Sequence, residues 1–141
     1  MSLLEMLQQP AVDRTATVKY KGAQYTLRGR ASATLYERCF MLSDSDKTKY
    51  AQHWGRLNDT EFSESLVPKV MAIAETLEHE DDAEKRYDPT EIAKLAIIRG
   101  DLFLKLLVAA LEVLGLTEDD VDAVSEVASG NSDASADSEP S

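Results

Sequence analysis

The sequence predicts a mainly α-helical fold, in which a small helical bundle follows an N-terminal β-hairpin and precedes a disordered acidic C-terminal tail. Three observations predict it. Apolar residues recur at helical spacing through most of the chain after residue 32, strand-forming residues flank a Lys-Gly pair at residues 21–22, and residues 129–141 contain no hydrophobe larger than alanine. We therefore divide the chain into an amphipathic arm (1–14), a domain of hairpin and helices (15–128) and a tail (129–141).

Residues 2–9 place three leucines at helical spacing, Leu3, Leu4 and Leu7. Pro10 ends this segment, because proline cannot continue a helix. A helix this short is marginal in water by itself. We therefore expect the arm to be stable only when it docks, and the sequence leaves open whether it docks on a partner or on its own domain.

Residues 16–27 predict a β-hairpin. Strand formers, among them Tyr20 and Tyr25, flank Lys21-Gly22, which can supply the positive φ that a tight turn needs. A lone two-stranded hairpin is barely stable in water. The hairpin must therefore pack on the helices or pair with another sheet edge.

Three helices are predicted between the hairpin and residue 80. Ser32 can cap one that ends near residue 42, where the run Ser43-Asp-Ser-Asp46 breaks it and offers the cap of a short second one. The third runs to about residue 80. Either Thr60 caps it and Pro68 kinks it, or Pro68 moves its start to about Val67. We favour the start at Val67.

One long helix is predicted from residue 89 to about residue 114. Asp88 caps it, Pro89 fits its first turn, Glu91 stands at its third position, and Gly115 suits the left-handed residue after its end. Apolar residues cover more than half of its circumference, so the helix lies in the core or at an interface. We favour the core.

A last short helix and the tail follow. Thr117 can cap the helix, and Val121, Val124 and Val127 give it a weak apolar stripe. Residues 129–141 cannot bury enough apolar surface to offset the entropy lost on ordering, so we expect them to be disordered.

Composition and charge restrict the partners. With 141 residues, 43% of them hydrophobic, the chain is long enough for one domain with a real core. Its net charge of −11 disfavours a nucleic-acid backbone or an anionic membrane as partner. Residues 1–60 carry nine Lys/Arg and six Asp/Glu, whereas residues 61–141 carry six and twenty. This asymmetry is typical of a globular body followed by an acidic, solvated segment.

The sequence also indicates a compartment. The single cysteine, Cys39, excludes an internal disulfide and fits a reducing environment. Residues 1–10 lack the basic start and long apolar stretch of a signal peptide. The most apolar run, residues 102–116, is interrupted by Lys105 and Glu112 and is shorter than the about 20 residues that span a bilayer. We expect a soluble cytoplasmic protein.

No group of side chains is arranged for catalysis or metal binding. The chain has two histidines, His53 and His79, and no Cys-x-x-Cys pair. Cys39 lies on a predicted apolar stripe, where a buried structural thiol is commoner than a catalytic partner of His53. The acidic run 78–82 lacks the ligand alternation and the glycine of a calcium loop. We expect a non-enzymatic protein without cofactor or metal.

With catalysis and metal binding set aside, we expect the protein to act by binding other proteins. The arm, the edge of the hairpin and the long apolar helix can each offer it. The candidate partner-binding residues are Leu3, Leu4, Leu7, Tyr20, Tyr25, Leu102, Phe103 and Leu106.

The order of features resembles the tail assembly chaperones of long-tailed bacteriophages. It is carried by the hairpin sequence Thr17-Val18-Lys19-Tyr20-Lys21-Gly22-Ala23-Gln24-Tyr25-Thr26-Leu27, followed by helices and an acidic end, over roughly residues 15–128. The resemblance implies a holdase without catalytic residues, which coats the tape-measure protein and recruits tail-tube subunits in the bacterial host cytoplasm. It also implies absence from the finished virion and the short form of a frameshifted pair. Assembly into a homo-oligomer is left open.

Two other functions fit the same features. A structural or connector subunit of a phage particle would join its hairpin edge to a neighbour's sheet. An acidic inhibitor that imitates nucleic acid is suggested by the twenty carboxylates after residue 60. A small enzyme has the least support, because no acid, base and nucleophile converge in the sequence.

Overall fold

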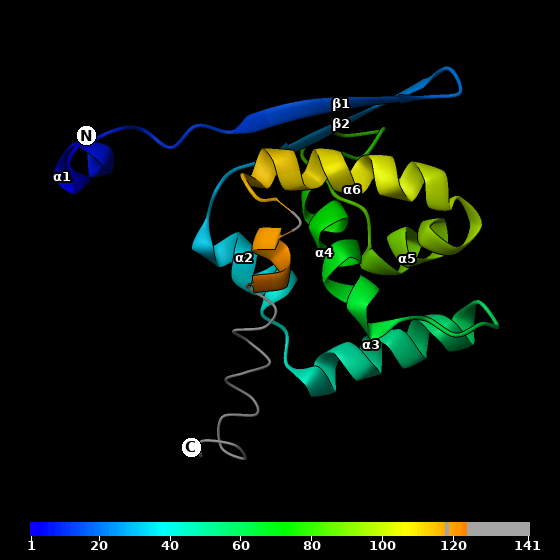
Figure 1. Cartoon of the computed structure of the whole chain (residues 1–141). Coiled ribbons are helices and arrows are strands. Elements are labelled where there is room, and N and C mark those ends of the chain that lie inside the picture. The colour runs from blue at the N-terminus through cyan, green and yellow to red at the C-terminus, as the bar shows by residue number, and fades with distance from the viewer. Residues whose placement is uncertain (118, 124–141) are drawn as a thin grey trace, which may run out of the picture.

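The structure is a helical bundle with a two-stranded antiparallel hairpin along one side, which confirms the predicted fold class (Figure 1). The computed structural model describes residues 1–117 and 119–123, so the predicted tail lies outside the described residues. The elements in chain order are α1 (Leu3–Leu7), β1 (Arg14–Tyr20), β2 (Ala23–Gly29), α2 (Ala33–Phe40), α3 (Asp44–Leu57), η1 (Glu64–Leu66), α4 (Val67–Thr76), α5 (Pro89–Ile98) and α6 (Gly100–Leu114).

The predicted hairpin is confirmed and lies along α6 (Figure 1). Lys21 and Gly22 take positive φ values of 48° and 83°, as a tight two-residue turn requires. Along β1, Ala16, Val18 and Tyr20 are partly buried against the core, and the residues between them are exposed. The hairpin therefore has one face on the helices and one in solvent.

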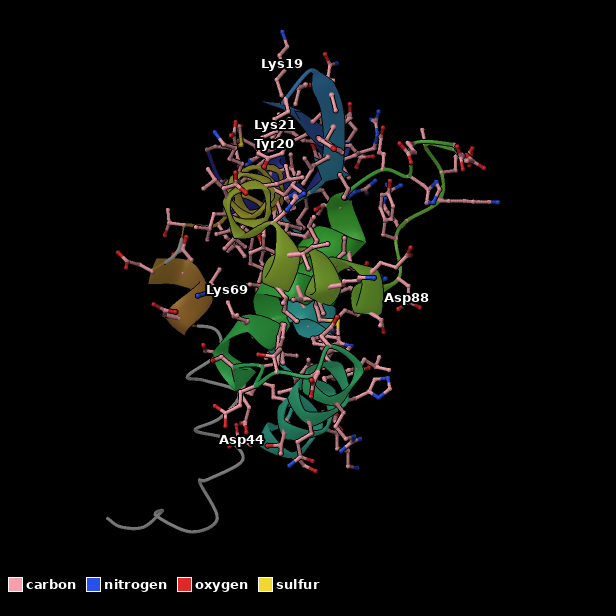
Figure 2. All side chains as sticks on the ribbon, turned by 90° about the vertical axis from the view of Figure 1, so that its right-hand side faces the viewer. Lys19, Tyr20, Lys21, Asp44, Lys69 and Asp88 are labelled. Atoms are coloured by element: carbon pink, nitrogen blue, oxygen red, sulfur yellow. The ribbon has the colours of Figure 1, made fainter. Side chains whose placement is uncertain are left out.

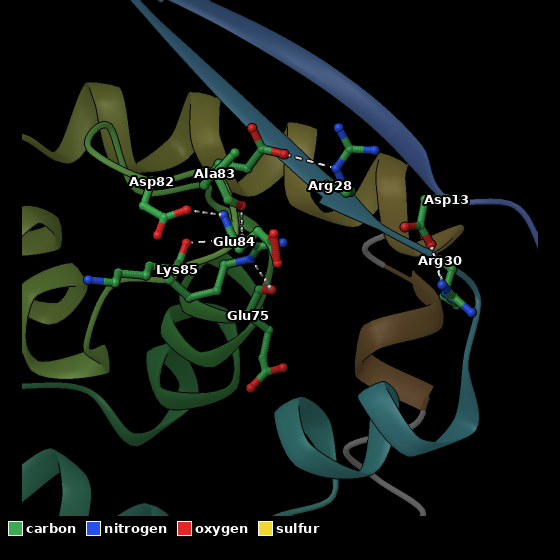
Figure 3. Close-up of polar contacts among 10 residues, drawn as sticks. Asp13, Arg28, Arg30, Glu75, Asp82, Ala83, Glu84 and Lys85 are labelled. Atoms are coloured by element: carbon green, nitrogen blue, oxygen red, sulfur yellow. Dashed lines mark hydrogen bonds and ion pairs between the residues drawn. The ribbon is translucent and has the colours of Figure 1, made fainter.

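The two edges of the hairpin differ. On the β2 side, Leu27 forms a β-bridge with Leu77, and the Thr26 carbonyl accepts a hydrogen bond of 2.9 Å from the Glu78 N–H. Arg28 Nε donates to Glu78 Oε2 at 2.9 Å on the same side (Figure 3). This edge is thereby covered in part, whereas within residues 1–117 and 119–123 no strand pairs with the outer edge of β1.

Helix α4 occupies the centre of the bundle, between α2, α5 and α6 (Figure 1). It starts at Val67, as predicted, with Pro68 in its first turn, where the missing N–H would have no helical partner. Most of its residues are buried. It ends at Thr76, short of the predicted end, because Leu77 adopts an extended backbone and pairs with β2.

Helix α2 begins at the predicted Ser32 cap, and α3 begins at Ser43, the first residue of the run 43–46 that was predicted to hold its cap. Ser32 Oγ accepts a hydrogen bond of 3.5 Å from the Leu35 N–H, and Ser43 Oγ accepts one of 3.1 Å from the Asp46 N–H. These hydroxyls satisfy N–H groups that have no partner within the first helical turn.

Trp54 anchors α3 to the rest of the bundle. Its side chain is 1% exposed, and its ring centroid lies 5.2 Å from that of Tyr50 and 5.3 Å from that of Phe62. Its Nε1–H donates to Thr90 Oγ1 at 3.3 Å. A buried indole usually satisfies its N–H in this way, and here the bond joins α3 to the first turn of α5.

The prediction of one helix from residue 89 to about residue 114 is wrong, because the chain breaks at Arg99 into α5 and α6. Arg99 has φ −143° and ψ 65°, outside the helical region. The predicted start is confirmed by a reciprocal capping box between Asp88 and Glu91. An unbroken helix would extend about 39 Å, whereas the two shorter helices both pack on α4. The apolar pattern therefore belongs to two helices with different buried faces.

A helical turn after α6 begins at the predicted cap. Thr117 Oγ1 accepts from the Asp120 N–H at 3.2 Å, and Asp120 Oδ2 accepts from the Thr117 N–H at 2.9 Å. Val121 follows and is 3% exposed, so the turn packs on the core. Val124 and Val127 lie outside the described residues.

Gly55→Ala should destabilise the fold. A Cβ atom at Gly55 would lie 2.7 Å from the Thr60 carbonyl oxygen, which belongs to the backbone and cannot simply rotate away. We expect the free energy of unfolding, measured by urea denaturation, to fall by about 1–3 kcal/mol. Gly100→Ala is the matched control, because its Cβ position has no atom within 4 Å. An equal loss in both variants would contradict the steric explanation.

Candidate protein-binding surface

The N-terminal arm (residues 1–13) projects from the body of the molecule with its apolar side chains exposed (Figure 1). Leu3, Leu4 and Leu7 are 70%, 71% and 71% exposed, and Met6 is 55% exposed. No residue of α1 is buried. The short helix expected around the three leucines is present, and in this structure its apolar side chains remain in solvent.

Local hydrogen bonds form α1. Ser2 Oγ accepts from the Glu5 N–H at 3.2 Å, and Glu5 Oε1 accepts from the Ser2 N–H at 3.0 Å. The bond from the Ser2 backbone lowers the pKa of Glu5, because it favours the charged carboxylate. Capping alone does not hold a five-residue helix in water. The helix gains stability only when its leucines are covered.

An ion pair holds the end of the arm next to β1, and the residues between this ion pair and α1 have no regular structure. Arg30 Nη2 and Asp13 Oδ1 form an ion pair of 2.7 Å just before β1 (Figure 3). Between α1 and this ion pair, residues 8–12 form neither helix nor strand. Five residues of extended chain reach about 17 Å. The arm can therefore contact a surface well away from its root.

The hairpin tyrosines make contacts within the chain. The Tyr20 hydroxyl donates to Asp101 Oδ2 at 2.8 Å and thereby lowers the pKa of that carboxyl group. Tyr25 is partly buried against the core. Figure 2 shows Tyr20 near the tip of the hairpin, far from Asp44 at the other end of the molecule. Both tyrosines help to dock the hairpin, and their binding to a partner stays a prediction.

The three candidate residues on α6 belong to the core. Leu102, Phe103 and Leu106 are 5%, 3% and 0% exposed and pack in the single apolar cluster of the bundle. This is the role that we favoured for the long helix over an interface. These side chains offer almost no surface to another protein, so the arm and α6 do not form one continuous site through them.

The sequence does not reveal which side of α6 stays outside. Leu104 and Val108 are 59% and 63% exposed and stand one helical turn apart. The sequence does not distinguish these two residues from the buried ones, because apolar residues cover most of the circumference of the predicted helix. The break at Arg99 separates α5 from α6, and its local signal in the sequence is Gly100, a poor helix former directly after it.

The residues considered for chemistry lie on different elements. Cys39 is fully buried on α2, His53 is exposed on α3, and His79 follows α4. The His79 ring stacks on Tyr87 with centroids 4.5 Å apart, and its Nδ1 lies 3.8 Å from Asp81 Oδ2. Among the described residues, no three His, Cys, Asp or Glu side chains come together as a metal site.

The described helices do not include one with the length and apolar character needed to cross a membrane. Comparisons of the chain with protein-family models, with curated proteins and with solved structures found no match. The exposed apolar arm and the outer edge of β1 are the surfaces of this fold from which we argue a function.

Cys39 should be unreactive while the protein is folded. Burial raises the pKa of its thiol to about 12, with a smaller contribution from Glu75, so the reactive thiolate is absent at pH 8. We expect alkylation at pH 8, followed by mass spectrometry, to be at least about a hundredfold slower in buffer than in denaturing urea. Equal rates in the two solutions would contradict the buried position.

Proposed function

We propose that this protein is a tail assembly chaperone that binds apolar helical segments of a tape-measure protein and recruits tail-tube subunits. The observation that carries the proposal is the arm, whose three leucines are each at least 70% exposed. A holdase must present apolar surface to a client without an enzymatic step. The proposal also rests on the resemblance in the order of hairpin, helices and acidic end.

The spacing of the leucines suits a helical client. Leu3 and Leu7 stand four residues apart and share one face of α1 with Leu4 beside them. Such a stripe packs into the groove between apolar residues of another helix. A tape-measure protein, as a long helical chain with apolar stripes, offers this kind of groove repeatedly.

The charge of the chain supports the same role. A protein that exposes leucines risks associating with itself through them. A net charge of −11 makes copies of the chain repel one another at long range. Basic client segments are attracted by the same field.

A structural subunit of a phage particle is the second candidate, and the uncovered outer edge of β1 favours it. Such an edge can pair permanently with a neighbour's strand. Mass spectrometry of purified particles separates the two functions, because a chaperone leaves the finished particle and a subunit remains in it.

Substituting the arm leucines tests the proposal. Co-expression with the intact chain should raise the solubility of a tape-measure fragment, and the two should co-purify. In the triple variant Leu3→Ser, Leu4→Ser, Leu7→Ser we expect the affinity to fall at least about a hundredfold, because each leucine buried in the complex contributes about 1.5–3 kcal/mol. The melting temperature should not change, since these side chains are exposed.

Leu57→Ser is the matched control, because Leu57 is an exposed leucine of α3 with 58% exposure. It should bind the fragment as the natural sequence does. If the intact chain neither solubilises nor retains the fragment, the chaperone function is wrong. If the triple variant binds as well as the control, the arm is not the client site.

A further inference from the structure

We propose that two copies of this chain form a two-fold dimer, in which the β1 strands pair edge to edge and the exposed faces of the two α6 helices pack together. The dimer contains one continuous four-stranded antiparallel sheet backed by two antiparallel helices. It goes beyond the proposed function, because it assigns a partner to a surface that the arm does not use.

Within the part of the chain that the structure describes, alternate residues of β1 have backbone groups that pair with no other strand. In an antiparallel pair, every second residue directs its N–H and C=O away from the partner strand. Thr26 is such a residue on β2, since its carbonyl accepts from the Glu78 N–H outside the hairpin. Thr26 stands opposite Thr17, so Thr17 turns its backbone groups to the outer edge of β1, and so do Thr15 and Lys19.

One register pairs all three residues with a second β1 strand. With Thr17 on the two-fold axis, Thr17 faces the partner's Thr17 and Thr15 faces the partner's Lys19. No like charges stand opposite each other in this register, and threonine pairs are favourable across strands. A shift that places Lys19 on the axis sets two lysines against each other. The edge is therefore complementary to itself.

Helix α6 lies under β1 and runs antiparallel to it. At one end the Tyr20 hydroxyl bonds Asp101, and at the other a Cβ atom on Gly115 would lie 3.0 Å from the Arg14 guanidinium. Six strand steps cover about 20 Å and fourteen helix steps about 21 Å, so the two elements match in length. The middle of β1 at Thr17 therefore lies near the middle of α6 at Val108.

The exposed face of α6 turns toward the free edge. Helix α4 packs on α6 and contacts β2. The exposed residues of α6 include Leu104, Lys105, Val108 and Glu112. Because α4 lies on the β2 side of α6, we infer that these residues lie on the β1 side. In Figure 2, α6 is seen along its axis and lies below the hairpin.

Pairing of the strands brings two α6 helices to packing distance. Adjacent hairpins in one sheet have centres about 9.6 Å apart, and helices pack with axes 8–10 Å apart, both by general geometry. About the same axis, Val108 meets the partner's Val108, and Lys105 lies across from the partner's Glu112. The same two-fold rotation thus covers the outer edge of β1, buries the exposed apolar residues of α6 and pairs opposite charges. If a single strand of another protein paired with β1 instead, the exposed Leu104 and Val108 of α6 would remain uncovered.

The oligomeric state of the full chain tests the dimer. Sedimentation equilibrium over a wide range of protein concentration should show a dimer in equilibrium with monomer. Val108→Glu places two carboxylates at the axis and should raise the dissociation constant at least about tenfold. Leu57→Glu is the matched control, because Leu57 on α3 is 58% exposed against 63% for Val108. A monomer at every concentration, or equal dimerisation of both variants, overturns the proposal.

A cross-link tests the register. In a hydrogen-bonded antiparallel pair the Cα atoms are about 5.5 Å apart, which lies within the range of a disulfide. Mild oxidation should therefore convert Thr17→Cys into a covalent dimer, and the buried Cys39 should not compete. Gln24→Cys, exposed on β2 and away from the axis, should stay monomeric on a denaturing gel. A dimeric protein whose Thr17→Cys variant does not cross-link pairs through another surface, which also overturns the proposal.

Discussion

Burial of α4 and α6 against each other is the contact on which the other elements depend. Helix α6 contacts both strands and α5, and α4 contacts α2, α3 and β2. Each large apolar side chain buried between them contributes about 1.5–3 kcal/mol. The hairpin has too few strands to be stable alone, so its position follows from α6. The two central helices thus fix the position of the hairpin and of the other helices that pack on them.

Single hydrogen bonds orient the outer elements on this centre. The Tyr36 hydroxyl of α2 donates to the Leu114 carbonyl at 2.7 Å, at the end of α6 where that carbonyl has no helical partner. Burial raises the pKa of Tyr36, so the hydroxyl keeps its proton through the neutral range. Two ion pairs, Arg28 with Glu78 and Arg38 with Glu75, join the basic first half of the chain to the acidic second half. Their exposure limits each to at most about 1 kcal/mol.

Features that depend on neighbours in sequence could be predicted, and features that depend on packing could not. Caps at Ser32 and Asp88 were predicted correctly, because a cap needs a polar side chain within three residues of its partner. The cap of α3 was placed only within the run 43–46, since four polar residues in a row each fit that role. The break at Arg99 was missed, since it is stabilised by the docking of both helices on α4. The exposure of Leu104 and Val108 depends on that break, so the apolar face of α6 could not be found without the structure.

Under the proposed chaperone function, the short link between α1 and the Asp13 ion pair would affect how long a client stays bound. A link of about 17 Å keeps the arm close to any segment that already touches the body. At that range the effective concentration of the arm is in the millimolar range, so its contact forms within the complex and not from solution. Leucine contacts that are weak individually then suffice to slow release. A long client with repeated apolar stripes could slide from one stripe to the next without fully dissociating.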